Sequence, residues 1–366
     1  MPILRMATIV AMAVLLTAST AIAADLSAMT WDEIATRAKA EGELTWSVGY
    51  LQNDLRRFVG TFEHRYGIKV RIPEGSTQAN ADKLVAEKGR RTDVFSWGFD
   101  DYETIDKTSF FIPLTMLPQD SGRVTKLLGV DNGGYVLAYW GNQTGIAYDP
   151  AKLTKDALPQ TPEQFAAFWQ AHPGKFGFNY QYGGAGPSFV QNMMRIIDKL
   201  DFDDGTSTKE RLTSLQPSFD FFNRYAKDYV VTTGNGDSIT RISDGEFWMA
   251  PAWEDQLAGL QRRGEVRKDI AFYIPKMGMS GGANGVAIPL NAPHPDAAAL
   301  FVYWLTSAET QSALNRDFGT MPMNTSADDS HALVPKEQRQ YETGWAAQPF
   351  RNDSFQAFID NVVLKH

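Results

Sequence analysis

The 366-residue sequence contains no cysteine and only five histidines. A chain without cysteine has no disulfide framework, no thiol nucleophile and no thiolate metal site. No segment beyond the N-terminus approaches the run of about eighteen apolar residues that spans a bilayer. No internal repeat is visible, and a chain of this length favours two domains with a large buried core. The histidines are scattered and show no metal-ligand spacing: His64, His172, His294, His331 and His366.

The sequence also lacks the short signatures of common enzymes. It has no Gly-x-Ser-x-Gly elbow, no His-Glu-x-x-His and no Gly-x-x-x-x-Gly-Lys-Ser/Thr loop. The sequence also has fewer basic residues than acidic ones. Setting aside Arg5 leaves 34 basic residues against 43 acidic ones, a net charge of −9. This balance disfavours a nucleic-acid or anionic-membrane binder, although a local site can carry either sign.

The N-terminus has the pattern of a secretory signal peptide over residues 1–23. Arg5 supplies the positive start, Ala7–Leu16 is an uninterrupted apolar core, and Ala21–Ala23 is a small-x-small cleavage site. We therefore expect cleavage near Ala23–Ala24 and a periplasmic protein, with an uncleaved anchor as the alternative. Without cysteine there is no lipobox for a lipid anchor.

Strands and helices alternate through the first part of the mature chain. The expected order is helix Trp31–Glu41, strand Leu44–Val48, a helix capped by Asn53 and ended by Gly67, strand Ile68–Ile72, helix 78–87 and strand Thr92–Trp97. This order is typical of a doubly wound parallel sheet, in which ligands lie beyond the carboxyl ends of the strands. The rule places these residues on a cleft rim: Gly49, Tyr50, Trp97, Gly98 and Phe99.

Two later segments predict crossings between two lobes. Val136–Tyr148 is a long strand that we expect to be interrupted at Gly141, and Gly281–Gly285 leads into a strand over Val286–Pro289. Two or three such crossings make a hinge. The other expected elements are a helix capped by Thr161, a strand over Phe176–Tyr180, a helix opened by 183–188, a helix from Pro295 to Trp304, and a helix capped by Thr306 and ended by Gly319.

Seven segments are spaced along nearly the whole mature chain. They are FVGTFEHRYGIKV (58–70), TDVFSWG (92–98), YWGNQTGIAYDPAKL (139–153), AHPGKFGF (171–178), GPSFV (186–190), DGEFWMAPAWED (244–255) and the segment 271–327. In this order they resemble the iron/thiamine/polyamine/phosphonate branch of the bacterial solute-binding proteins that feed ABC importers. The resemblance implies a two-lobed α/β fold, each lobe a mostly parallel sheet flanked by helices. It assigns residues 24–141 plus about 286–325 to lobe 1, and 142–285 plus about 326–366 to lobe 2.

The same resemblance implies a function and a site. The protein would capture a small polar solute by hinge closure and deliver it to an inner-membrane permease driven by a separate ATPase. It would be a monomer without catalytic residues, cofactor or resident metal. The ligand-binding residues carried over from the family are Tyr50, Trp97, Phe99, Asn142, Tyr180, Tyr182, Gly186, Ser188, Trp253, Glu254, Asp255 and Asn284.

Two charge hypotheses remain open for this site. The glycine-rich turn 183–188 opens a helix, whose free N–H groups suit a phosphate, phosphonate or carboxylate. Aromatic rings beside Glu254 and Asp255 instead suit a cation, and a zwitterion could use both. The polyamine pattern is only partly met at Ala283–Gly285. The adjacent tyrosines of iron binders are replaced by the spaced pair in Tyr180–Tyr182.

Two other classes of protein are alternatives to the receptor. A secreted hydrolase would need opposed carboxylates, and only the pair Glu254–Asp255 falls where a cleft is expected. The other acidic pairs are expected in solvated turns: Asp100–Asp101, Asp203–Asp204 and Asp328–Asp329. A structural or chaperone-like periplasmic protein would not need glycine-rich crossings between two lobes.

Overall fold

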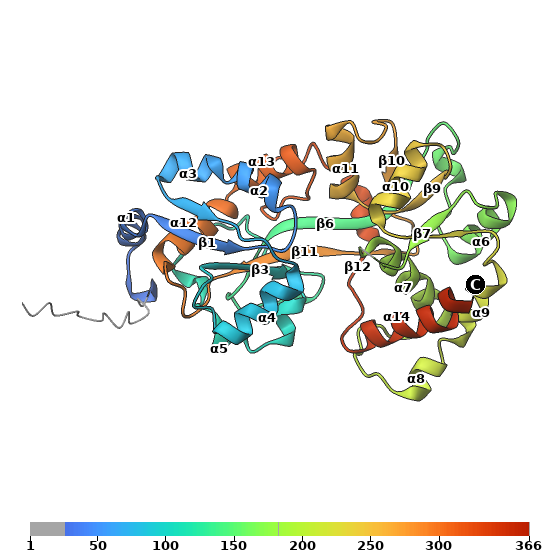
Figure 1. Cartoon of the computed structure of the whole chain (residues 1–366), viewed down its shortest axis with the longest axis horizontal. Helices are drawn as coiled ribbons and strands as arrows, with labels where there is room; N and C mark the ends of the chain where they lie inside the picture. Colours follow the sequence, from blue (N-terminus) through green and yellow to red (C-terminus); the bar gives the residue numbers. More distant parts are fainter. Residues whose placement is uncertain (1–25, 182, 366) are drawn as a thin grey trace, which may run out of the picture.

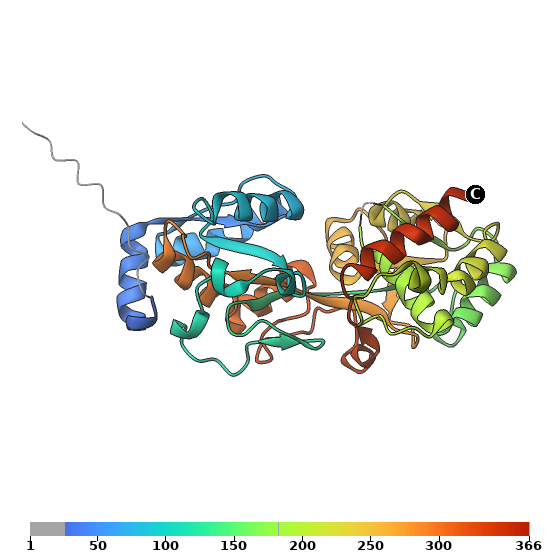
Figure 2. The ribbon, with the colours of Figure 1, turned by 90° about the horizontal axis from the view of Figure 1, so that it is seen from below.

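The computed structural model describes residues 26–181 and 183–365, so the predicted signal peptide and Tyr182 lie outside the described residues. Two lobes are joined by two long strands, β6 (Leu137–Tyr148) and β11 (Met279–Ala287), which run side by side between them (Figure 1 and Figure 2). Both strands belong to one mixed sheet in the order β10-β6-β11-β3-β1-β2. The α/β, two-lobed prediction is therefore confirmed.

Lobe 1 is built on three parallel strands together with the lobe 1 ends of the two long strands. β1 (Glu43–Ser47) pairs in parallel with β2 (Lys69–Arg71) and β3 (Val94–Gly98), and β11 runs antiparallel to both β3 and β6. A hairpin of β4 (Lys126–Leu127) and β5 (Val130–Asp131) lies beside them. The helices of this lobe are α1 (Trp31–Glu41), α2 (Gln52–Phe58), α3 (Gly60–Tyr66), α4 (Thr77–Glu87), α5 (Lys107–Phe110), α12 (Pro295–Leu305) and α13 (Ala308–Phe318).

Lobe 2 surrounds the other ends of the two long strands. β6 pairs antiparallel with β9 (Met249–Trp253) and β10 (Ala271–Tyr273), β12 (Glu342–Thr343) pairs with β11, and β7 (Gly177–Asn179) pairs in parallel with β8 (Val230–Thr232). The helices are α6 (Pro162–Ala171), α7 (Ala185–Asp198), α8 (Lys209–Thr213), α9 (Gln216–Arg224), α10 (Asn235–Ser243), α11 (Glu254–Arg263) and α14 (Phe350–Asn361). The 3-10 turns are η1 (Leu26–Ala28), η2 (Asp101–Thr104), η3 (Leu114–Met116), η4 (Lys155–Ala157), η5 (Lys336–Tyr341) and η6 (Val363–Lys365).

Each lobe has its own apolar core, and the chain passes from one lobe to the other three times. The large apolar cluster of lobe 2 takes its members from Ile146 to Met279 and again from Val334 to Val362. The two apolar clusters of lobe 1 are formed by the other segments of the chain. Trp140 is their last member before the first crossing, and Met323 is their last member before the third. Three crossings with separate cores on either side are the construction that permits hinge bending.

Local expectations were met at many boundaries and wrong at others. The strand expected over Val286–Pro289 starts earlier, because β11 runs from Met279 to Ala287 and includes the glycines. Thr161 caps α6 and left-handed glycines end α3 and α13, as predicted. The helix expected from Asn53 to Gly67 is instead two helices, and its first N-cap is Leu51, whose side chain offers no acceptor. Ser307, not Thr306, caps α13, because the Thr306 hydroxyl bonds back to the Val302 carbonyl.

The predicted interruption at Gly141 is also wrong, because β6 passes through this residue as one continuous strand. The glycine is needed for a close approach instead. Its N–H and carbonyl exchange hydrogen bonds of 3.1 and 3.0 Å with the Met321 backbone. A Cβ at residue 141 would lie 2.5 Å from the Met321 oxygen and 2.4 Å from Cε of Met323. Glycine therefore allows the third crossing to lie against the first.

A buried acidic cluster joins α1 to α12 at the far end of lobe 1. The fully buried Asp296 carboxylate accepts from Nε of Arg37 at 3.1 Å, and Glu41 accepts from the Ala297 N–H at 2.7 Å. Burial, followed by the charge of Asp296, raises the pKa of Glu41 to about 7, against the lowering effect of the Ala297 amide. The folded protein therefore holds this proton more tightly than the unfolded chain does.

We expect Gly141→Ala to lower the free energy of unfolding by about 1–3 kcal/mol, because the new methyl group overpacks the Met321 contact. Urea denaturation measures the change. Gly60→Ala is the matched control, since nothing lies within 4 Å of a Cβ placed there. Equal stability of the two variants would contradict the close-approach role.

Glu41→Gln should change the pH dependence of stability with a defined sign. Since the folded pKa of Glu41 lies above the unfolded value, its stabilising contribution is complete below about pH 4.5 and disappears as the pH rises through about 7. Glutamine avoids this loss, so the variant's melting temperature should gain on the wild type between pH 5 and pH 8. Glu33→Gln is the control, because hydrogen bonds from Thr30 lower the pKa of Glu33, so its stabilising contribution is lost only as the pH falls below about 4.5 and its difference from the wild type should stay constant between pH 5 and pH 8. A constant difference between Glu41→Gln and the wild type across this range would refute the assignment.

Candidate ligand-binding cleft

Two adjoining cavities lie where the lobes meet, and they share three residues. One has a volume of about 390 Å³ and the other about 600 Å³, and both are lined by Asn142, Trp253 and Asn284. The carboxyl ends of β1 and β3 open onto them, as expected for a sheet of this type. Lobe 2 contributes α7, α11 and α14 to the opposite side.

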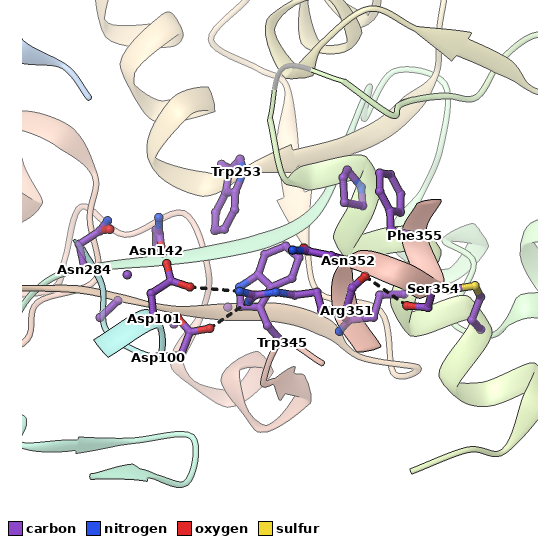
Figure 3. A pocket seen from close by; sticks show the side chains of 17 residues that line it. Asp100, Asp101, Asn142, Trp253, Asn284, Trp345, Arg351, Asn352, Ser354 and Phe355 are labelled. Carbon is purple, nitrogen blue, oxygen red and sulfur yellow. Dashed lines mark hydrogen bonds and ion pairs between the residues drawn. The ribbon is translucent and has the colours of Figure 1, made fainter. Parts of the chain in front are cut away.

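The floor of the cleft is neutral and polar. Asn142 lies on β6 opposite Gly282, and Asn284 lies on β11 opposite Trp140. Both asparagines are half-buried, and neither side-chain amide has a hydrogen-bond partner among the described residues. Figure 3 shows them on the same side of the two strands. Each amide offers both a donor and an acceptor, so the floor can bond to a solute of either charge.

Two tryptophans form an aromatic wall on the lobe 2 side. Trp253 ends β9 and Trp345 follows β12, and their ring centroids are 6.2 Å apart with a tilt of 36°. Gly184, at the start of α7, packs against both rings. A Cβ on Gly184 would lie 3.1 Å from Trp253 and 3.3 Å from Trp345. The rings are half-buried, so part of each faces the cavity.

Charged groups meet across the smaller cavity. Asp100 and Asp101 follow β3 in lobe 1, whereas Arg351 extends from α14 in lobe 2 (Figure 3). The Arg351 guanidinium donates to Asp100 at 3.0 Å and to Asp101 at 3.1 Å. Burial, followed by the charge of Asp100, raises the pKa of Asp101, while Arg351 acts to lower it. This contact joins the two lobes directly.

The larger cavity is lined by an ordered aromatic and acidic group. The Tyr50 ring meets Trp140 edge-on at 5.5 Å, and its hydroxyl bonds to that of Tyr139 at 2.5 Å. Asp255 accepts from Nε1 of Trp140 at 3.0 Å, and burial raises the pKa of Asp255 despite this bond. Three arginines and two more aspartates complete the charged lining: Arg57, Arg262, Arg263, Asp54 and Asp317.

The predicted ligand residues divide into those at the cleft and those elsewhere. Tyr50, Asn142, Trp253, Asp255 and Asn284 line one or both cavities. Phe99 contributes to an adjoining space of about 690 Å³, but its ring is 2% exposed and belongs to the lobe 1 core. The linings of the two cleft cavities do not include Trp97, Tyr180, Gly186, Ser188 and Glu254.

Within the helix start at Gly183–Ser188, several polar groups already have partners inside the protein. The Ala185 N–H donates to Oδ1 of Asn235, and the Gly186 N–H donates to Oδ1 of Asn179. Pro187 has no N–H. The Ser188 side chain is buried and bonded to Thr144 and to the Ser280 N–H. The N–H groups of Ala185 and Gly186, which the anion hypothesis would use, are therefore already occupied by contacts within the protein.

Glu254 likewise has a structural contact in place of a free carboxylate. It is fully buried and bound by both oxygens to Nη2 of Arg339, at 3.2 and 3.0 Å. Burial raises the pKa of Glu254 to about 8, although the guanidinium acts to lower it. Arg339 also pairs with Glu342 at 2.7 Å. The adjacent residue Asp255 faces the cavity, because consecutive residues at a helix start point in different directions.

Sequence reasoning missed the acidic pair and its arginine. Asp100 and Asp101 were expected in a solvated turn, but they line the smaller cavity. Their place directly after β3 was the available signal, since the strand-end rule applies to them as it does to Tyr50. No pattern identifies Arg351, which lies 251 residues from Asp100 in the chain. Trp345 was missed for the same reason.

Within 26–181 and 183–365, no three acidic or histidine side chains gather as metal ligands. None of the helices in the same segments combines the length and apolar character that a membrane crossing requires.

The sequence and the fold are similar to those of known proteins. The family model described as "Bacterial extracellular solute-binding protein" matches residues 58–341. No curated protein sequence gives a significant match. Similar solved structures include iron-bound HitA from Pseudomonas aeruginosa, which is 17% identical with a TM-score of 0.64, covering 87% of this chain and 99% of that one.

Two further solved structures share the fold, and their names refer to other molecules. The spermidine/putrescine-binding protein PotD from Streptococcus pneumoniae is 11% identical, with a TM-score of 0.64 and coverage of 87% and 99%. AfuA from Actinobacillus pleuropneumoniae, with bound fructose-6-phosphate, is 16% identical, with a TM-score of 0.61 and coverage of 88% and 99%. At these identities the likeness establishes the fold and does not select a solute.

Arg339→Met tests the structural role of Glu254. Removing one partner of a buried pair should cost about 3–5 kcal/mol of unfolding free energy near pH 9, where Glu254 is ionised. The cost should shrink as the pH falls through about 8 toward pH 6, because Glu254 then takes up a proton and loses its charge. Arg65→Met is the matched control, since the Arg65–Glu309 pair is largely exposed. A loss equal to that of the control, at both pH values, would refute the buried-pair role.

Proposed function

The chain belongs to the bacterial extracellular solute-binding proteins, and on that premise we propose that it captures a small polar solute between its lobes by hinge closure. It is the substrate-binding protein of an ABC transporter. Proteins of this kind bind small solutes and work with a membrane permease and its ATPase. The observation that carries the proposal is the pair of cavities at the lobe junction, crossed by the same strands that join the lobes.

Each part of the cleft has a role in this proposal. Asn142 and Asn284 bond to the solute from the floor, because their amides have no partner in the part of the chain that the structure describes. Trp253 covers an apolar or cationic part of the solute, and Tyr50 and Asp255 contact its other end. Closure would bring the lobe 2 wall toward the ends of β1 and β3 and exclude water from the bound solute.

The hydrolase alternative is not favoured by the acidic groups. Glu254 is bound by Arg339, and Asp255 by the Trp140 indole, so this pair offers no opposed acid and base. We further propose that the protein is exported, that cleavage occurs before Ala24, and that the mature form is a monomer. N-terminal sequencing of protein from the periplasmic fraction tests the cleavage position.

A thermal-shift screen of the mature protein tests the receptor function. The panel contains polyamines, guanidino compounds, aminophosphonates, phosphate esters, thiamine, sugars, amino acids and dicarboxylates. A true ligand at about a hundred times its Kd adds about 2.7 kcal/mol of stability, which should raise Tm by about 2 °C or more. Small-angle scattering should show a more compact particle with that ligand. A stabilising ligand that leaves the scattering profile unchanged would contradict hinge closure.

Trp253→Ala should weaken binding of the stabilising ligand at least about tenfold, because the ring covers the solute in the closed cleft. Calorimetric titration measures the Kd. Trp31→Ala is the matched control, since Trp31 begins α1 at the outer end of lobe 1, far from the cleft (Figure 1). Unchanged affinity in Trp253→Ala would remove this residue from the site. Denaturing and refolding the protein first removes any solute retained from the expression host.

A further inference from the structure

The surroundings of Arg351 are those of a bound organic cation. Its guanidinium contacts two carboxylates, Asp100 and Asp101, through separate nitrogens at 3.0 and 3.1 Å. On another side the guanidinium carbon lies 5.7 Å from the centroid of the Trp345 ring. Paired carboxylates and an aromatic face are the groups with which proteins bind guanidinium and ammonium ions. Figure 3 shows the three charged side chains meeting inside the cavity.

Resting on the function proposed above, we propose that Arg351 is an internal counter-ion and that a guanidinium or ammonium group of the solute replaces it on Asp100 and Asp101. The solute is then cationic, or carries a cationic end. This assignment selects the cation hypothesis for the site, with a different pair of carboxylates from the one that the sequence suggested.

The charge balance of the cavity favours a cation even with Arg351 in place. Two carboxylates face one guanidinium, and the other polar groups of the lining are neutral amides and a hydroxyl. The adjoining space of about 690 Å³, to which Phe99 contributes, adds the carboxylates of Glu103 and Asp203 and the guanidinium of Arg195. An anionic solute would therefore meet a surplus of negative charge, whereas a second cation would reduce it.

The backbone beneath the carboxylates is shaped to hold them in the cavity. A Cβ on Gly98, the last residue of β3, would lie 2.5 Å from Oδ2 of Asp101 and 3.2 Å from Oδ1 of Asp100. Glycine at this position lets both side chains fold back over the strand end. The two carboxylates then lie next to Asn142 and Asn284, the residues of the cleft floor (Figure 3).

Arg351 is placed so that it can be exchanged. It belongs to α14 of lobe 2, whereas both carboxylates belong to lobe 1, so a change in the angle between the lobes alters both contacts. The Arg351 side chain is 21% exposed and those of Asp100 and Asp101 are 37% and 29% exposed. Ion pairs with this much access to water are replaced at little cost.

Titration of the refolded mature protein with agmatine, putrescine and succinate tests the proposal. The first two carry guanidinium or ammonium groups, and succinate is the anionic counterpart. Arg351→Gln should bind agmatine or putrescine at least about tenfold more tightly than the wild type, because the internal competitor is gone. Arg351→Lys should remain close to the wild type. Asp100→Asn with Asp101→Asn should abolish binding of the cation in either background.

Arg65→Gln is the control, since it removes the same charge from an exposed pair outside the cleft. Circular dichroism and melting curves establish that each variant is folded. Weaker or equal cation binding by Arg351→Gln, or no cation binding by it at all, overturns the proposal. Succinate binding that Arg351→Gln abolishes also overturns it and makes Arg351 an anion ligand. If a different solute from the screen binds through Trp253, the receptor function stands while the cation assignment fails.

Discussion

The pairing of β6 with β11 is the interaction on which the rest of the molecule depends. Their antiparallel register runs from Leu137 and Val286 in lobe 1 to Gln143 and Gly281 at the boundary of lobe 2. These backbone hydrogen bonds hold together two crossings that are more than a hundred residues apart in sequence. The same strands carry the asparagines of the floor, so the connection between the lobes and the base of the cleft are one piece of structure.

A buried polar network fixes the lobe 2 ends of these strands. The Thr144 hydroxyl donates to the Ser280 carbonyl at 2.5 Å, and Ser188 of α7 joins both strands through its hydroxyl. Gln191 continues the network, donating to Oγ of Ser280 and accepting from the Ala346 N–H. Since Gln191 also lines the smaller cavity, the aromatic wall at Trp345 is connected to the crossing strand through one side chain. Satisfied buried networks of this kind make the surrounding structure rigid.

The sequence predicted the fold well because its signals are local. The places of the strands, the Thr161 cap and the glycines that end α3 and α13 depend on residues within a few positions of each other. Side chains at strand ends, such as Tyr50 and Trp253, could be placed at the cleft by the same reasoning. Helix starts were harder, because whether Ser188 faces the core or the cavity depends on the rotation of α7 against distant strands.

Groups recruited from distant parts of the chain could not be predicted at all. Arg339 pairs with Glu254 from 85 residues away, and Arg351 pairs with Asp100 from 251 residues away. Neither arginine belongs to a motif. Each meets its carboxylate only in the folded protein, after the third crossing has returned the chain to lobe 2. The sign of a site's charge is a property of such distant neighbours, so it was the least predictable feature of this protein.

The neutral floor has a consequence for how the protein could acquire a new specificity. Amide side chains can reverse their donors and acceptors by rotating, so Asn142 and Asn284 need not change when the solute changes. Discrimination then rests on the walls, which α14, α11 and the end of β3 supply separately. Substitutions in these peripheral elements can therefore change which solute is bound, while the crossing strands β6 and β11, about which the lobes bend, stay unchanged.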